Sequence, residues 1–161
     1  MKYLFFFMLL ATLKSFGQTK LDTQSWISST INNYAREDIY NPTLQVYFVD
    51  GNIWFTEIEN NYDIVQRVLP LKKLNNVTIV ENNRGFTLIL ECRNGQTCCS
   101  TEHLLNEDGV AKLSYINDIK NTRIEIYLQK SLKDDDLNKR LVKAIKHIIK
   151  LNGGTVISNT F

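Results

Sequence analysis

Residues 43–59 read TLQVYFVDGNIWFTEIE. Apolar and polar side chains alternate on both sides of Asp50-Gly51, as in strands that bury one face. An Asp-Gly pair suits a two-residue type I′ turn, because that turn needs a positive φ at both central positions. The stretch therefore predicts an antiparallel hairpin with strands over 44–49 and 53–59.

The same period of two continues after this hairpin. It predicts five more strands, over 63–69, 77–81, 86–92, 96–101 and 122–128. Asn94-Gly95 predicts a second tight hairpin, between the strands over 86–92 and 96–101. Consecutive strands joined by short turns favour an antiparallel sheet of six or seven strands, within one domain that extends over 18–161.

A helical period of 3.6 flanks the strands on both sides. The first predicted helix covers 21–35, with Asp22 or Thr23 as its N-cap. The second covers 132–151 and is amphipathic, with a capping box from Ser131 to Asp134 at its start. Its apolar face is formed by Leu137, Leu141, Ala144, Ile145, Ile148 and Leu151, and Gly153-Gly154 supplies a left-handed stop. The fold class is α+β, and we expect the C-terminal helix to cover one open face or end of the sheet.

Two stretches give the chain a resemblance to a known superfold. They are VYFVDGNIWF over residues 46–55 and VLPLKKL over residues 68–74. Together with the terminal helix they resemble the pleckstrin-homology-like superfold, in particular its GRAM-type branch, over residues 42–151. The resemblance implies an antiparallel β-sandwich or barrel capped by the C-terminal helix, and a binding role. Some members bind phosphoinositides through basic residues around the first strand–strand loop, but the Asp50-Gly51 loop carries no lysine or arginine.

The N-terminus has the layout of a secretory signal peptide. Lys2 precedes a nearly continuous apolar run over 3–13, and Ser15 and Gly17 occupy the small-residue positions before a cleavage site. We therefore predict that residues 1–17 are removed and that the protein is exported, to the periplasm or outside the cell. The apolar run is shorter than the roughly 20 residues of a membrane span.

The charge balance argues against nucleic acid as a partner. Without Lys2 and Lys14, the 19 basic residues fall level with the 17 acidic residues. A formally neutral domain has no overall field that attracts DNA or RNA.

The three cysteines, with His103, are the main concentration of reactive side chains. In a two-residue hairpin Cys92 and Cys98 point to opposite faces, whereas Cys92 and Cys99 share a face diagonally. A bulge or a longer loop brings Cys92 opposite Cys98 instead, and export makes a disulfide feasible. The alternatives are a zinc or copper site, a cysteine nucleophile with His103 as its base, and cysteines that act as small apolar side chains.

Two surfaces are candidates for contact with a partner. Tyr47, with Trp54 or Phe55, would form an outward aromatic patch on the first hairpin. The polar side of the C-terminal helix carries Lys139, Arg140, Lys143, Lys146 and Lys150, with His147 among them. That side is a candidate contact for an anionic membrane surface or an acidic partner, although a solvated helix face is the favoured interpretation.

No motif for catalysis, for a cofactor or for a metal accompanies these features. The sequence therefore favours a small exported, non-enzymatic domain that binds a protein or peptide partner. A thiol- or metal-dependent activity at Cys92, Cys98, Cys99 and His103 is the alternative from the enzyme class, and membrane-surface attachment is a third.

Native protein isolated from its source is expected to begin at Gln18 and to be found outside the cytoplasm. N-terminal sequencing of the native material and cell fractionation measure this directly. A cytoplasmic product that begins at Met1 would contradict the prediction.

Overall fold

The computed structural model describes residues 19–36, 43–59, 63–107, 110–115 and 121–157. The predicted leader over 1–17 lies outside these residues. No helix in the described ranges is both long and apolar enough to cross a membrane.

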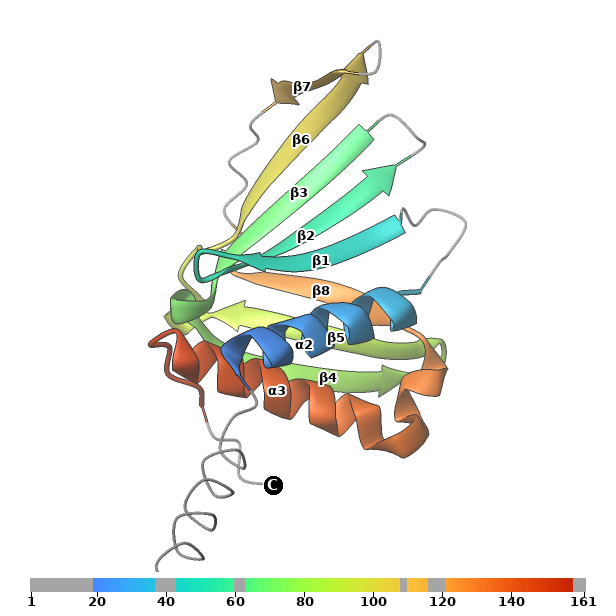
Figure 1. Cartoon of the computed structure of the whole chain (residues 1–161), viewed down its shortest axis with the longest axis vertical. Helices are drawn as coiled ribbons and strands as arrows, with labels where there is room; N and C mark the ends of the chain where they lie inside the picture. Colours follow the sequence, from blue (N-terminus) through green and yellow to red (C-terminus); the bar gives the residue numbers. More distant parts are fainter. Residues whose placement is uncertain (1–18, 37–42, 60–62, 108–109, 116–120, 158–161) are drawn as a thin grey trace, which may run out of the picture.

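The described part of the chain contains eight strands in two antiparallel sheets (Figure 1). The larger sheet has the order β1-β2-β3-β6-β7, and the smaller sheet has the order β4-β5-β8. The strands are β1 (Thr43–Val49), β2 (Asn52–Glu59), β3 (Asp63–Pro70), β4 (Leu74–Asn82), β5 (Gly85–Cys92), β6 (Ser100–Glu107), β7 (Val110–Tyr115) and β8 (Arg123–Leu128). The strand β7 was not among the six or seven predicted from the alternation.

The first predicted hairpin is confirmed. Strands β1 and β2 pair antiparallel, and Val49 opposite Asn52 closes the ladder at the turn. Asp50 and Gly51 both have positive φ, at 48° and 77°, as the two-residue turn requires.

The second predicted hairpin is wrong. After β5 the chain enters a short 3-10 turn over Arg93–Gly95 and starts its next strand, β6, only at Ser100. Strand β6 pairs with β3 in the larger sheet, while β5 pairs with β4 and β8. A strand has only two edges, so β5 has no edge left for the chain that follows it.

The first helix, α2 (Lys20–Tyr34), starts close to its predicted position but uses a different cap. Its N-cap is Thr19, not Asp22 or Thr23. The hydroxyl of Thr19 accepts a hydrogen bond from the Asp22 amide at 3.1 Å, and the Asp22 carboxylate accepts one from the Thr19 amide at 3.1 Å. This reciprocal pair is a capping box, and the hydrogen bonds from the Thr19 hydroxyl and amide lower the pKa of the Asp22 carboxyl.

The second helix, α3 (Leu137–Leu151), starts later than the predicted residue 132. The residues before it form a 3-10 helix over Lys130–Asp136 that buries Leu132. Asp135 and Asp136 have left-handed φ angles of 54° and 55°. They interrupt the helical path, so no capping box forms at Ser131–Asp134.

The helix α3 ends where the sequence predicted, but a different set of side chains is buried near that end. Gly153 has a φ of +79° and ends the helix. Leu151 was predicted to lie on the apolar face, yet it is 48% exposed, whereas Ile149 is fully buried. The helix therefore presents a face centred nearer to Ile145, Ile148 and Ile149 than the spacing alone suggested.

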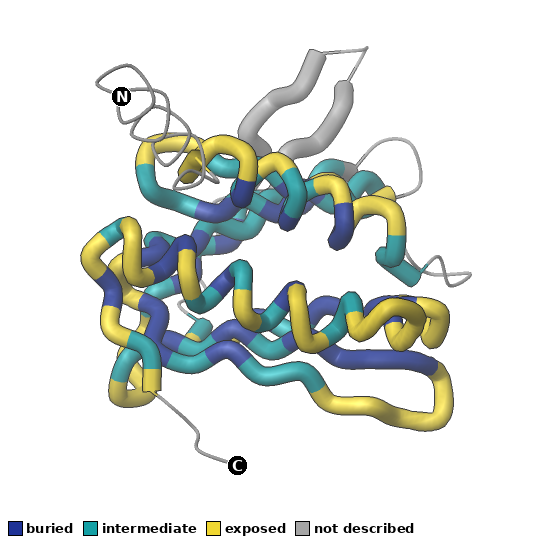
Figure 2. The backbone as a smooth tube through the Cα atoms, turned by 60° about the horizontal axis from the view of Figure 1, so that its bottom comes forward, coloured by how far each residue is buried: buried dark blue, intermediate teal, exposed yellow. Residues whose placement is uncertain are grey.

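Both helices, rather than the C-terminal one alone, cover the sheets. They lie side by side, with α2 against β1 and α3 against β4 (Figure 1). Buried residues from both sheets and both helices form one continuous hydrophobic core. Figure 2 shows buried positions along the strands and the inner sides of the helices, and exposed positions on the turns.

The fold is α+β with antiparallel sheets, but the sheets stay open and do not close into a pleckstrin-homology-like barrel. Parts of the free edges are occupied by other segments. The Asn32 side chain accepts a hydrogen bond from the Val46 amide of β1 at 2.8 Å. The Ile157 amide donates to the Asn75 carbonyl of β4 at 2.8 Å.

We expect Gly85→Ala to destabilise the protein by about 3 kcal/mol. Gly85 has a φ of +144°, and a Cβ at this position would clash with the Leu128 carbonyl oxygen across the β5–β8 pair. Urea unfolding measures the loss.

Gly95→Ala is the matched control, because Gly95 also has a positive φ, of +67°, but no atom of the described residues lies within 4 Å of the position that an alanine Cβ would take there. It should cost only about 1 kcal/mol for the left-handed backbone. Equal losses in the two variants would contradict the role assigned to the close approach at Leu128.

Candidate functional site

The cysteine cluster contains one disulfide. Cys92 and Cys98 are bonded, with their Cα atoms 5.8 Å apart and a separation of six positions in the sequence. The arrangement in the structure is therefore the one with a longer loop, and the tight hairpin that would separate these side chains is absent. The disulfide joins the end of β5 to the segment that leads into β6.

Cys99 is the remaining thiol, and it is buried. It is 1% exposed, and its backbone pairs with Asn121. Burial raises the pKa of the Cys99 thiol to about 11. At neutral pH very little of it is thiolate, which is the form a nucleophile or a metal ligand needs.

For His103 the structure describes the backbone alone. Its backbone pairs with Val65 of β3, and its side chain lies outside the described residues. Among the side chains that the structure describes, no group of three or more His, Cys, Asp or Glu residues is placed to hold a metal ion.

The predicted aromatic patch is formed by Tyr47 and Trp54 and not by Phe55. Tyr47 and Trp54 are opposite each other in the β1–β2 register, and their rings stack at 5.9 Å with an interplanar angle of 12°. Phe55 is only 1% exposed and belongs to the core. Successive side chains of a strand point to opposite faces, so burial of Phe55 places its neighbour Trp54 on the outer face.

A third side chain extends this patch. Val68 of β3 pairs with Trp54, and cross-strand partners share one face of a sheet. Tyr47, Trp54 and Val68 thus form a row across three strands, called the aromatic face below. None of the three belongs to the hydrophobic core or to the side chains packed against it.

A polar row borders the aromatic face. Gln45, Thr56 and Gln66 are in register with one another, and Gln66 is in register with Glu102 of β6. They lie on the same face, two positions along each strand from the aromatic row. Apolar rings edged by hydrogen-bonding side chains are typical of protein interfaces.

Two of the basic residues of α3 make contacts within the protein. Lys139 is paired with Asp136 at 2.8 Å, and the Arg140 guanidinium lies 5.5 Å from the centre of the Trp26 ring on α2. Lys143 and Lys150 are exposed, and Lys146 is half-buried. His147 is exposed, as expected.

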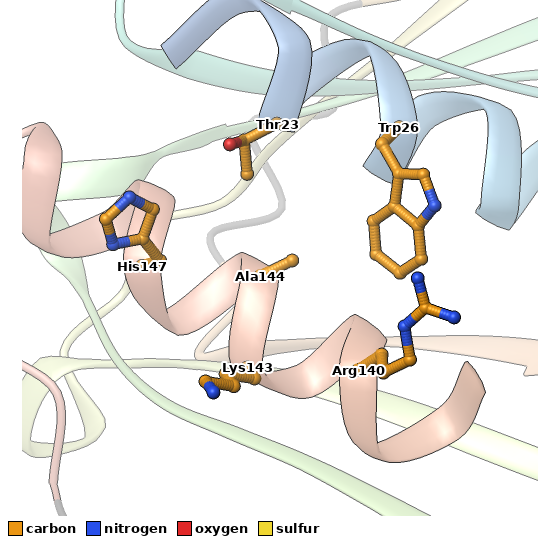
Figure 3. Close-up of a pocket in the computed structure, with 6 residues that line it drawn as sticks. All are labelled: Thr23, Trp26, Arg140, Lys143, Ala144 and His147. Atoms are coloured by element: carbon orange, nitrogen blue, oxygen red, sulfur yellow. The ribbon is translucent and has the colours of Figure 1, made fainter. Parts of the chain in front are cut away.

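Arg140, Lys143 and His147 are instead brought to a pocket between α2 and α3. Its lining is completed by Thr23, Trp26 and Ala144, and its volume is about 450 Å³ (Figure 3). Thr23 is 4% exposed, and its hydroxyl oxygen has no hydrogen-bond partner. We call this feature the interhelical pocket.

Sequence reasoning missed Thr23, Trp26 and Val68 as site residues. Thr23 was expected only as a possible N-cap of α2, and the pattern of that helix does not say that α3 lies beside it. Val68 joins the aromatic face only through the β2–β3 register, which the separate strand patterns do not determine.

Comparison with protein-family models, with curated proteins and with solved structures finds no match to this chain. The function is therefore inferred from the geometry of the aromatic face and of the interhelical pocket.

Thiol titration of the unfolded, unreduced protein is expected to find one thiol, and native protein at pH 8 should react with iodoacetamide far more slowly. The slow reaction follows from the burial and raised pKa of Cys99. Rapid alkylation of the native protein would contradict the burial of this thiol.

The raised pKa of the Cys99 thiol also makes the free energy of unfolding depend on pH. The folded state holds the Cys99 proton more tightly than the unfolded state, so this contribution is complete below pH 9 and is lost as the pH rises toward 11. Urea unfolding of the wild type and of Cys99→Ala across this range isolates the effect, because the variant lacks the thiol. An identical pH dependence in both proteins would contradict it.

Proposed function

We propose that this chain is an exported, non-enzymatic binding module that holds a protein or peptide partner against its aromatic face. The observation that carries the proposal is the Tyr47–Trp54 stack on the side of the larger sheet that faces away from the core. A partner that covers this pair would remove its remaining exposed apolar area from water, which is favourable.

The chemistry of the pair favours a polypeptide partner. Tyrosine and tryptophan supply a large apolar area with few rotatable bonds, and they are enriched among the residues that dominate binding energy.

The pleckstrin-homology-like resemblance supports the same class of function. Members of that superfold mostly bind other molecules and rarely catalyse reactions. The proposal includes a relationship to that superfold and export of the protein to the periplasm or outside the cell.

The alternatives have less support. A thiol-dependent activity would require a thiolate, and the two bonded cysteines and the buried Cys99 do not supply one readily. Attachment to a membrane surface would use the basic side of α3, where Lys139 already has Asp136 as a partner and Arg140 lies against Trp26.

The test is capture of partners from the envelope fraction by immobilised protein, followed by affinity measurement with the recovered partner. Tyr47→Ser with Trp54→Ser should weaken binding by about 30-fold, which corresponds to about 2 kcal/mol for two interface anchors. Loss of the cross-strand stack should also lower the thermal midpoint, so the double variant must be shown to be folded at the temperature of the binding measurement.

Tyr127→Ser is the matched control, since Tyr127 is an exposed tyrosine on the smaller sheet. It should retain wild-type affinity. Equal affinity of the Tyr47/Trp54 double variant and the wild type for the same partner would refute the proposal.

A further inference from the structure

We propose that the interhelical pocket is a second, independent site that binds a small organic acid, with one carboxylate beside an apolar body. The pocket lies between α2 and α3, on elements other than the strands that form the aromatic face. Its ligand is identified by a buried hydroxyl, the charge of the lining and the shape of the apolar wall.

The buried hydroxyl of Thr23 is the first observation. A threonine within a helix commonly donates its hydroxyl proton to the carbonyl four residues earlier. Here the Thr19 carbonyl accepts from the Thr23 amide at 3.1 Å, and the Thr23 hydroxyl has no partner. Thr23 is among the residues that line the pocket, and Figure 3 shows its side chain projecting from α2 toward α3 with the hydroxyl oxygen to one side. A buried donor without an acceptor is costly, and a ligand oxygen would remove that cost.

The charge of the lining is the second observation. Arg140, Lys143 and His147 contribute to the pocket, and no Asp or Glu is among the lining residues that the structure describes. Among the described residues, no carboxylate forms an ion pair with Arg140 or Lys143. Arg140 and Lys143 are both exposed, and two positive side chains beside a hydroxyl donor favour an anion as the ligand.

The geometry of the donors favours a carboxylate over a phosphate. The Arg140 guanidinium is a planar fork that matches two carboxylate oxygens, and its position over the Trp26 ring orients it. Phosphate sites commonly draw on free backbone amides at a helix N-terminus. At α2 the Asp22 amide already donates to Thr19, and the α3 residues of the pocket lie inside the helix.

The apolar side chains of the pocket indicate the part of the ligand that lies beyond its carboxylate. Trp26 and Ala144 face each other across the pocket in Figure 3, next to the charged groups. The volume of about 450 Å³ lies in the range of about 300–1,000 Å³ that is typical of small-molecule sites. A flat or branched apolar body would pack between these side chains while its carboxylate reaches Thr23 and Arg140.

Benzoate is the probe that tests the site, with benzamide as its uncharged counterpart and inorganic phosphate as the competing anion. The chain has two tryptophans, Trp26 and Trp54, so each supplies one indole N–H resonance. Benzoate should shift the Trp26 resonance in a saturable way and leave the Trp54 resonance in place. Benzamide and phosphate should bind at least about tenfold more weakly, because each lacks one half of the proposed recognition.

Variants assign the contacts. Thr23→Val should weaken benzoate binding by about tenfold through loss of a hydrogen bond to a charged group, without lowering the thermal midpoint, since it removes an unsatisfied buried hydroxyl. Lys143→Gln should weaken binding about threefold. Lys150→Gln removes the same charge from the same helix outside the pocket and should leave the affinity unchanged.

Several results would overturn the proposal. These are no saturable shift of Trp26 with benzoate, equal binding of benzamide, preferential binding of phosphate, or equal losses in Lys143→Gln and Lys150→Gln. The outcome for the interhelical pocket can be told apart from binding at the aromatic face, because the Trp54 resonance reports on that face in the same spectrum.

Discussion

Two open sheets, each with one apolar side, need a common cover, and the packing of α2 beside α3 supplies it. The inner face of the larger sheet contributes residues such as Phe55 and Leu69, and the smaller sheet contributes residues such as Phe86 and Leu88. The helices add Ile27 and other aliphatic side chains to the same cluster. Apolar area removed from water is the largest favourable contribution to folding, so the position of each helix follows from the need to bury both sheets at once.

This arrangement also determines which surfaces are left over. Because both helices pack on the inner side of the sheets, the opposite side of the larger sheet is left uncovered by any other described element, and Tyr47 and Trp54 stack on it without joining the core. The contact between the helices is imperfect near Thr23 and Arg140, where polar side chains and a tryptophan meet instead of aliphatic ones. The two candidate sites are thus consequences of one packing arrangement.

The disulfide stabilises the point at which the chain crosses from the smaller sheet to the larger one. Cys92 ends β5, and the chain must leave the smaller sheet there to reach β3 in the larger one. The bond to Cys98 ties this crossing segment to the strand it leaves, and hydrogen bonds from Cys92 and Cys98 to Thr122 and Asn121 hold it against the approach to β8. A crossing between sheets is a place where backbone groups lose their ladder partners, and these contacts replace them.

The sequence by itself determined part of the local structure. Alternation around Asp50-Gly51 predicted the first hairpin correctly, and the 3.6 period predicted both helices, because turn chemistry and side-chain period act over a few residues. Only the tertiary structure decided that Asn94-Gly95 is not a hairpin, that β6 joins β3, and that α2 lies against α3. These choices depend on competition for strand edges and on shared burial between segments far apart in the chain. The aromatic face and the interhelical pocket are composed across such segments, so their members, Val68 and Thr23 among them, became visible only after the chain had folded.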